Sequence, residues 1–156
     1  MGNEAIQYNK SDVWVVIAAY NEARIIKQTI AGVKNWAGHI VIVDDGSRDA
    51  TAREARETGV VVVVHPINRG QGASLRTGIE LALQYGAHII VTFDADGQFS
   101  HQEIPDMVLP VFRNEVDITI GSRFQSRRSN VPPFRRYYLA CFLFKIWWCD
   151  RSIKRY

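Results

Sequence analysis

The sequence contains little cysteine, with Cys141 and Cys149 as its two examples. They lie eight residues apart in an apolar stretch and form no CxxC pair. Neither a zinc site nor a disulfide framework is therefore indicated. This composition favours a reducing compartment, and we expect a cytoplasmic protein, with the inner face of the membrane as an alternative location.

A long apolar run is also missing. No segment reaches the roughly 18 apolar residues that a membrane-spanning helix needs, and the polar start, residues 1–12, lacks the apolar core of a signal peptide. The stretch 134–149 combines aromatic residues with flanking cations, which suits a helix lying in the lipid interface. A core helix or a dimer-interface helix explains it equally well. Both a peripheral membrane surface and a homo-oligomer therefore stay open.

The phosphate-binding motifs of the common nucleotide folds are absent. There is no GK[ST] sequence, and the Gly70-Gln71-Gly72 turn lacks the third glycine of GxGxxG, because Leu75 stands there. A P-loop is excluded and a dinucleotide-binding fold is disfavoured. Residues 68–72 are better interpreted as a tight turn that leads into a helix, with direct ligand contact as the alternative.

Acidic residues are scarce in the last quarter of the chain, which makes the charge asymmetric. Residues 1–117 carry 10 basic and 15 acidic side chains, whereas residues 118–156 carry nine basic side chains and one acid. The basic tail favours an anionic partner such as a phosphate or a membrane surface. Nucleic acid is disfavoured as a partner, because the body is acidic and no known nucleic-acid-binding module is present.

What the sequence does contain is an alternation of short β-branched runs and longer helical patterns. Unbroken runs such as the valines at 60–64 are typical of parallel strands covered on both faces. The pattern predicts an α/β fold, with three α/β/α layers and a mostly parallel central sheet. The predicted strands cover 13–18, 39–43, 60–64, 87–93 and 116–121, and the predicted helices cover 22–36, 49–58, 72–85 and 100–114.

Polar residues follow each of the five predicted strands. Ligands of parallel α/β sheets bind beyond the carboxyl ends of the strands, so we expect these residues to form one site at one rim. They are Tyr20, Asn21 and Glu22, then Asp44, Asp45, Gly46 and Ser47, then Asn68, Arg69 and Gly70, then Asp94, Asp96 and Gln98, and finally Gly121, Ser122 and Arg123.

Asp94 and Asp96 flank a small residue at the end of an apolar strand. Two carboxylates this close repel each other unless a cation lies between them. Mg²⁺ or Mn²⁺ fits, since each takes a few carboxylates together with ligand phosphates. The alternative is a pair of solvated turn aspartates before the helix that starts near Ser100.

Two further groups of residues are open to both a functional and a structural interpretation. Asp44 and Asp45 can accept hydrogen bonds from a base or a ribose, but Asp, Gly and Ser are also the ordinary residues of an Asx-type turn. Arg123 can hold a phosphate with two hydrogen bonds, whereas the arginines that follow it fit a solvated loop. The histidines are scattered and are interpreted as structural or surface residues: His39, His65, His88 and His101.

Five segments together resemble the family-2 glycosyltransferases of GT-A fold, and in particular the polyprenol-phosphate (dolichol-phosphate) mannosyl- and glucosyltransferase branch. The resemblance implies a nucleotide-sugar-binding domain over 1–124 and a basic, aromatic segment over 125–156 that faces the acceptor or the membrane. The segments follow the family's order and spacing: Val16–Glu22, Ile42–Asp49, Asn68–Gly72, Asp94–Gln98 and Gly121–Arg123.

The resemblance implies an inverting enzyme that moves a hexose from GDP- or UDP-hexose to polyprenyl phosphate. An acceptor phosphate is already ionised at neutral pH, its second pKa being about 6, so that no strong general base is required. The implied metal ligands for Mg²⁺ or Mn²⁺ are Asp94, Asp96 and Gln98, and the implied catalytic residues are Asp94, Asp96 and Arg123. The nucleotide sugar would contact Ala18, Tyr20, Glu22, Val43, Asp45, Asp94, Ala95, Asp96, Gln98 and Arg123.

The chain departs from the family pattern at several positions. Ala18 replaces a usual Pro, Gln71 a common Lys, and Phe99 a common His. Catalytic domains of the family also extend well past the Gly-Ser-Arg motif, so we expect the acceptor half to be incomplete. Two alternatives follow: a transferase acting on saccharide hydroxyls in cell-envelope polysaccharide synthesis, which needs a carboxylate base, or a non-catalytic remnant that binds nucleotide sugar or membrane.

Overall fold

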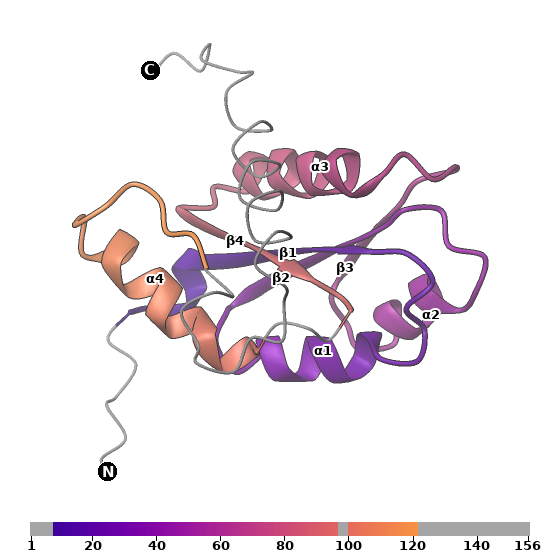
Figure 1. Ribbon diagram of the computed structural model, residues 1–156, viewed down its shortest axis with the longest axis horizontal. Coiled ribbons are helices and arrows are strands. Elements are labelled where there is room, and N and C mark those ends of the chain that lie inside the picture. The colour runs from indigo at the N-terminus through magenta and orange to yellow at the C-terminus, as the bar shows by residue number, and fades with distance from the viewer. Residues whose placement is uncertain (1–7, 97–99, 122–156) are drawn as a thin grey trace, which may run out of the picture. The chain divides into compact units, whose positions relative to one another are not determined.

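A computed structural model describes residues 8–96 and 100–121 of the chain, and its helices and strands belong to one compact unit, Met1–Thr119 (Figure 1). The described elements are, in chain order, η1 (Lys10–Asp12), β1 (Val13–Ala19), α1 (Ile26–Val33), β2 (His39–Asp44), α2 (Thr51–Arg56), β3 (Val61–Val64), α3 (Gln71–Gln84), β4 (Ile89–Asp94), η2 (His101–Glu103) and α4 (Ile104–Phe112).

The four strands form one parallel sheet in the order β3-β2-β1-β4. Its register brings the strand ends together, since Ala18 of β1 pairs with Val43 on one side and with Asp94 on the other. Residues that follow these three strands therefore leave the sheet at the same rim. The parallel sheet and its helices confirm the predicted α/β class.

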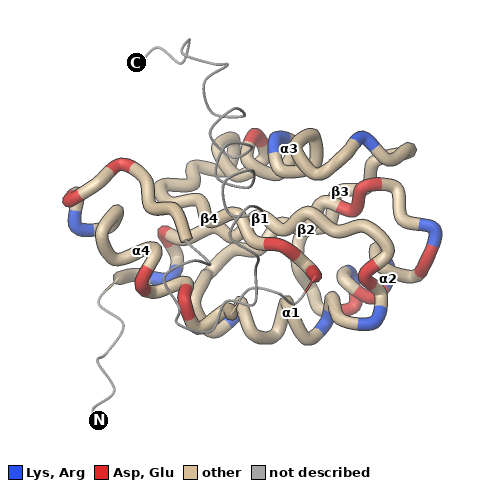
Figure 2. The backbone as a smooth tube through the Cα atoms, in the orientation of Figure 1, with Lys and Arg blue, Asp and Glu red and all other residues tan. Residues whose placement is uncertain are grey.

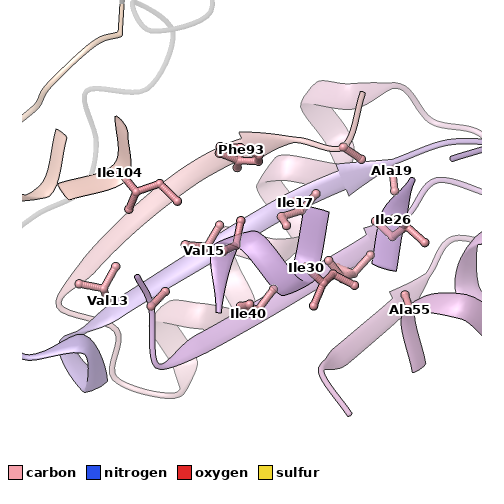
Figure 3. Packing of buried hydrophobic residues seen from close by; sticks show 14 of the residues in the cluster. Val13, Val15, Ile17, Ala19, Ile26, Ile30, Ile40, Ala55, Phe93 and Ile104 are labelled. Atoms are coloured by element: carbon pink, nitrogen blue, oxygen red, sulfur yellow. The ribbon is translucent and has the colours of Figure 1, made fainter. Parts of the chain in front are cut away.

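Helices cover both faces of this sheet, with α3 on one face and α1, α2 and α4 on the other (Figure 1). Side chains of β1 alternate between the two layers, as the two-residue period of a strand requires. Val13, Val15 and Ile17 face the α1 side, where Ile26 and Ile30 pack (Figure 3). These five side chains are fully buried, and burial stabilises each by about 1.5–3 kcal/mol. Burial on both faces explains the unbroken apolar runs of β1 and β2, and the three predicted layers are confirmed. The valine run of β3 departs from this expectation, because Val61 and Val64 are 51% and 42% exposed.

The first long helix is shorter than predicted. A helix over 22–36 was expected, but α1 covers Ile26–Val33. Residues 23–25 form a turn instead, which is closed by the Ile26 N–H donating to the Glu22 carbonyl at 3.0 Å. The backbone N–H groups of Glu22 and Ala23 donate to the side chains of Thr51 and Asp49, so tertiary contacts hold the chain where it enters α1.

The fifth predicted strand is wrong, since residues 116–121 form no strand. Its alternating apolar pattern is typical of a half-buried strand, yet Val116 and Ile118 are 43% and 45% exposed. Instead of pairing with β4, this segment is attached to α4 by the Thr119 hydroxyl, which donates to the Met107 carbonyl at 2.7 Å. β4 is therefore an edge of the sheet as far as the described residues extend.

None of the helices within residues 8–96 and 100–121 is long and apolar enough to cross a membrane. The segment 134–149, for which an interfacial helix was predicted, lies outside the described residues. The predicted boundary after residue 124 lies there too and stays a prediction.

Candidate functional site

A cleft of about 320 Å³ opens at the rim where β1, β2 and β4 end. Acidic residues, red in Figure 2, lie at this end of the strands as well as along α2 and α4. Four of the five loops that were predicted to converge, together with the first turn of α3, supply its walls. The lining residues are Ala18, Ala19, Tyr20, Glu22, Asp45, Asn68, Gly70, Gln71, Ser74, Asp94, Ala95 and Asp96.

The cleft brings together most of the predicted nucleotide-sugar contacts. Val43 is an exception, because it is fully buried and packs in the layer beneath α3. Gln98 and Arg123 lie outside the described residues, so their roles stay predictions. The predicted residues that line the cleft are Ala18, Tyr20, Glu22, Asp45, Asp94, Ala95 and Asp96.

The loop after β1 is fastened to the loop after β2 by reciprocal hydrogen bonds. Asn21 adopts a left-handed conformation (φ 57°), which Asn tolerates better than most residues. Its N–H donates to Ser47 Oγ at 2.9 Å, and its Oδ1 accepts from the Arg48 N–H at 2.9 Å. The Glu22 N–H donates to Thr51 Oγ1 at 2.8 Å. These bonds fix Tyr20 and Glu22 at the mouth of the cleft.

Two aspartates of the second loop are structural. Asp44 is buried, and its Oδ1 accepts from both the N–H and the hydroxyl of Ser47, which confirms the turn interpretation for this residue. Asp49 accepts from the Ala23 N–H and from Thr51. Burial works to raise the pKa of Asp49, but the Thr51 and Ala23 hydrogen bonds outweigh it, so its pKa is lowered. The sequence had not singled out Asp49.

Asp45 lies on the floor of the cleft and holds the loop after β3. Its Oδ1 accepts from the Arg69 N–H at 3.0 Å and lies 2.7 Å from His65 Nδ1, and its Oδ2 accepts from the Gly70 N–H at 2.7 Å. Burial alone would raise the pKa of Asp45, but these bonds together lower it. Asp45 is therefore an ionised carboxylate, and both of its oxygens accept hydrogen bonds from within the fold.

The segment Asp94-Ala95-Asp96 presents two carboxylates to the cleft. Ala95 is 2% exposed and packs in the core, so its two neighbours are directed outward. Gln71 Nε2 donates to Asp94 Oδ1 at 2.6 Å. Burial raises the pKa of Glu22, and the nearby carboxylates of Asp96 and Asp49 raise it further. Negative charge is thus concentrated at this wall.

The donor set at this wall fits a hard divalent cation that is shared with a phosphate ligand. Within the described ranges, no group of three or more His, Cys, Asp or Glu side chains could hold a metal by itself. Mg²⁺ is usually bound by one or two carboxylates plus substrate phosphates rather than by an all-protein cage. Asp94 and Asp96 provide two carboxylates, and the Glu22 carboxyl lies near enough to Asp96 for their charges to interact.

Two polar residues at or behind the cleft carried no local signal in the sequence. Ser74 on α3 is fully buried and lines the cleft, and its Oγ makes no hydrogen bond with the described residues. Its hydroxyl lies near enough to Asp45 to help lower the pKa of that carboxyl. His65 lies behind Asp45. The interpretation of His65 as structural fits its buried position.

The parallel sheet and its rim cleft define an α/β domain of GT-A type. Crystal structures of glucosyl-3-phosphoglycerate synthase from Mycobacterium tuberculosis share this fold. One, in complex with Mn²⁺, UDP-glucose and phosphoglyceric acid, superimposes with a TM-score of 0.57 at 24% identity, over 72% of this chain and 43% of the synthase. Another, in complex with Mg²⁺ and UDP, gives a TM-score of 0.55 at 24% identity, over 70% and 42% of the two chains.

The chain belongs to glycosyl transferase family 2, whose pattern matches residues 14–151. It is 41% identical over 83% of its length to an uncharacterized protein of Methanocaldococcus jannaschii. It is 31% identical over 77% of its length to UDP-N-acetylglucosamine–dolichyl-phosphate N-acetylglucosaminyltransferase of Methanococcus voltae. Polyprenol monophosphomannose synthase of Mycolicibacterium smegmatis is 32% identical over 70% of the chain. The chain covers 55%, 56% and 44% of these relatives, about half of their length.

Proposed function

We propose that this chain binds a nucleotide diphosphate sugar, GDP- or UDP-hexose, and that it is the donor half of an inverting transferase acting on polyprenyl phosphate. The observation that carries the proposal is the rim cleft, where Tyr20, Asp45 and the Asp94-Ala95-Asp96 wall meet. Relatives named for transfer to dolichyl phosphate support the acceptor class. The lipid groups in the names of these relatives also support association with a membrane surface.

Each wall of the cleft suits one part of such a donor. Tyr20 is 41% exposed at the mouth, so its ring can pack against a base, while the backbone of the 68–70 turn borders the same space. Mg²⁺ or Mn²⁺, when bound at Asp94 and Asp96, supplies positive charge that offsets the charge growing on a departing diphosphate. Gln71 holds the Asp94 carboxylate at the wall of the cleft through its Nε2 donation to Asp94 Oδ1. We also propose Gln98 as a ligand of the metal and Arg123 as a contact of the phosphate.

Calorimetric titration with UDP and GDP, with and without Mn²⁺, tests the donor site. We expect one nucleotide to bind, and Mn²⁺ to tighten binding at least about tenfold, which corresponds to about 1.4 kcal/mol. Asp94→Asn and Asp96→Asn should each remove the Mn²⁺ effect. Asp106→Asn is the matched control, because Asp106 is exposed on α4, away from the residues that line the cleft.

Failure of both nucleotides to bind the wild-type chain would refute the donor site. Transfer from the nucleotide sugar that binds is then measured with polyprenyl phosphate and with saccharide acceptors in parallel. Preferential transfer to saccharides would favour the alternative in polysaccharide synthesis, and binding without transfer would favour a non-catalytic role.

A further inference from the structure

His65 lies behind the cleft and does not line it. It follows β3 directly, is 5% exposed, and its N–H donates to the Asp44 carbonyl at 2.9 Å. Its ring joins two elements, because Nδ1 lies 2.7 Å from Asp45 Oδ1 and Nε2 lies 3.0 Å from Thr77 Oγ1 on α3. The imidazole is therefore held at both of its nitrogens.

The hydrogen-bond partners define what the ring does for Asp45. An ionised carboxylate only accepts hydrogen bonds, so Nδ1 carries a proton and donates to Asp45. Thr77 Oγ1 lies 3.0 Å from the Ala73 carbonyl, to which it donates, and its lone pairs can accept from Nε2. A neutral ring with the Nδ1 proton can instead accept the Thr77 proton at Nε2. The Nδ1–H···Asp45 bond is common to both states.

Asp45 in turn holds the 68–70 turn, which lines the cleft. Its carboxylate holds the N–H groups of Arg69 and Gly70. Gly70 has a φ of 89° and directly precedes α3, whose first residue, Gln71, reaches Asp94. One continuous series of contacts thus leads from His65 through the 68–70 turn to the acidic wall.

We propose that His65 is a positioning residue for the donor cleft, acting through its Nδ1–H bond to Asp45, which keeps the 68–70 turn in its ligand-binding position. The proposal rests on the proposed function, because it concerns the affinity of the same cleft. The two hydrogen bonds of the ring then have different effects. The bond to Asp45 affects ligand affinity, whereas the bond to Thr77 holds the ring in place. A side chain that merely fills space behind the cleft would draw no such distinction between its two bonds.

Two substitutions at this position separate the bonds. His65→Asn places an amide N–H close to the position of Nδ1 and can keep the bond to Asp45 while it loses the bond to Thr77. His65→Gln places its amide near Nε2 and does the reverse. Both are neutral amides, so a purely structural role would make their effects on the cleft similar.

The test is the dissociation constant of the nucleoside diphosphate–Mn²⁺ complex, measured by calorimetry for the wild type and the two variants. We expect His65→Asn to bind within about threefold of the wild type and His65→Gln to bind about tenfold or more weakly, the difference that one hydrogen bond to a charged group makes. Amide hydrogen exchange at Arg69 and Gly70 should be faster in His65→Gln than in His65→Asn, without ligand. Circular dichroism confirms that each variant is folded.

The outcomes separate this inference from the function on which it rests. No binding by the wild type removes the proposed function and the inference together. Binding by the wild type with equal losses in both variants removes the inference alone. If His65→Gln does not fold, Thr77→Val is measured beside His65→Asn, because it removes the Nε2 partner, together with the Thr77 donation to the Ala73 carbonyl, and leaves the Nδ1 bond to Asp45 in place. Thr77→Val should then bind like the wild type, and a tenfold loss of affinity would overturn the proposal.

Discussion

Replacing Asp45 by Asn tests how much this carboxylate contributes to the fold. The best orientation of the new amide keeps an oxygen toward the Arg69 N–H and His65, and turns its NH₂ group toward the Gly70 N–H. Two donors then face each other where the wild type has a 2.7 Å hydrogen bond. Gly70 retains a longer bond, 3.2 Å, to Asn68 Oδ1.

The expected loss follows from these contacts. A hydrogen bond to a charged group contributes about 1.5–3 kcal/mol, and the two bonds that remain lose their charge assistance. Asp45 is 3% exposed, so water does not replace what is lost. We therefore expect Asp45→Asn to lower the free energy of unfolding by about 2–4 kcal/mol at pH 7.

The effect should depend on pH in a defined direction. The pKa of Asp45 in the folded chain lies below its ordinary value of 3.8. The stability that the ionised group contributes is therefore fully present above pH 3.8 and is lost as the pH falls through the folded pKa. The difference between the wild type and Asp45→Asn should shrink below about pH 4.

Urea denaturation followed by circular dichroism, at pH 7 and near pH 3, measures both quantities. Asp117→Asn is the control, because Asp117 is exposed and such substitutions usually change stability by less than about 0.5 kcal/mol. A loss below about 0.5 kcal/mol for Asp45→Asn at pH 7, or an equal loss at both pH values, would refute the reasoning.

Two further substitutions test packing and loop attachment. Gly78→Ala should destabilise the fold by about 1–2 kcal/mol in urea denaturation, because the new Cβ would collide with Val16 Cγ1 and overpacking outweighs the gain in helix propensity; an equally stable variant would contradict the close packing of α3. Ser47→Ala removes the hydroxyl that links Asn21 to the buried Asp44, and should cost about 1–3 kcal/mol and speed amide exchange at Asn21; unchanged exchange there would show that this link does not fix the loop.

The strands of the sheet could be predicted from local sequence. β-Branched runs such as Val13–Ile17 and Ile40–Val43 are typical of parallel strands buried on both faces, and β1 and β2 are buried in this way. The common rim was predictable for the same reason, because parallel strands end on the same side of a sheet. That is why Tyr20, Asp45 and Asp94 could be grouped before the structure placed them in one cleft.

The fifth strand and the start of α1 could not be predicted in this way. Val116–Ile120 has the alternation of a strand, but a strand forms only if the segment pairs with the edge of β4. Instead, the Thr119 hydroxyl donates to the Met107 carbonyl of α4. The start of α1 follows a turn over residues 23–25, and the N–H groups of Glu22 and Ala23 are held there by Thr51 and Asp49, which lie more than 25 residues away in the sequence. The periodicity of a segment shows which secondary structure it can form, whereas its tertiary contacts determine which one it adopts.

The sequence by itself determined the layers, the rim and the two outward carboxylates of Asp94 and Asp96, because burial periodicity and strand direction are local properties of the chain. Only the tertiary structure decided the different roles of the two adjacent aspartates. Asp44 accepts a hydrogen bond within its own turn, whereas Asp45 contacts His65 and the Gly70 N–H, 20 and 25 residues further along the chain. Hydrogen bonds over such separations depend on how strands and loops pack in three dimensions. No local spacing in the sequence could therefore distinguish the two neighbouring carboxylates.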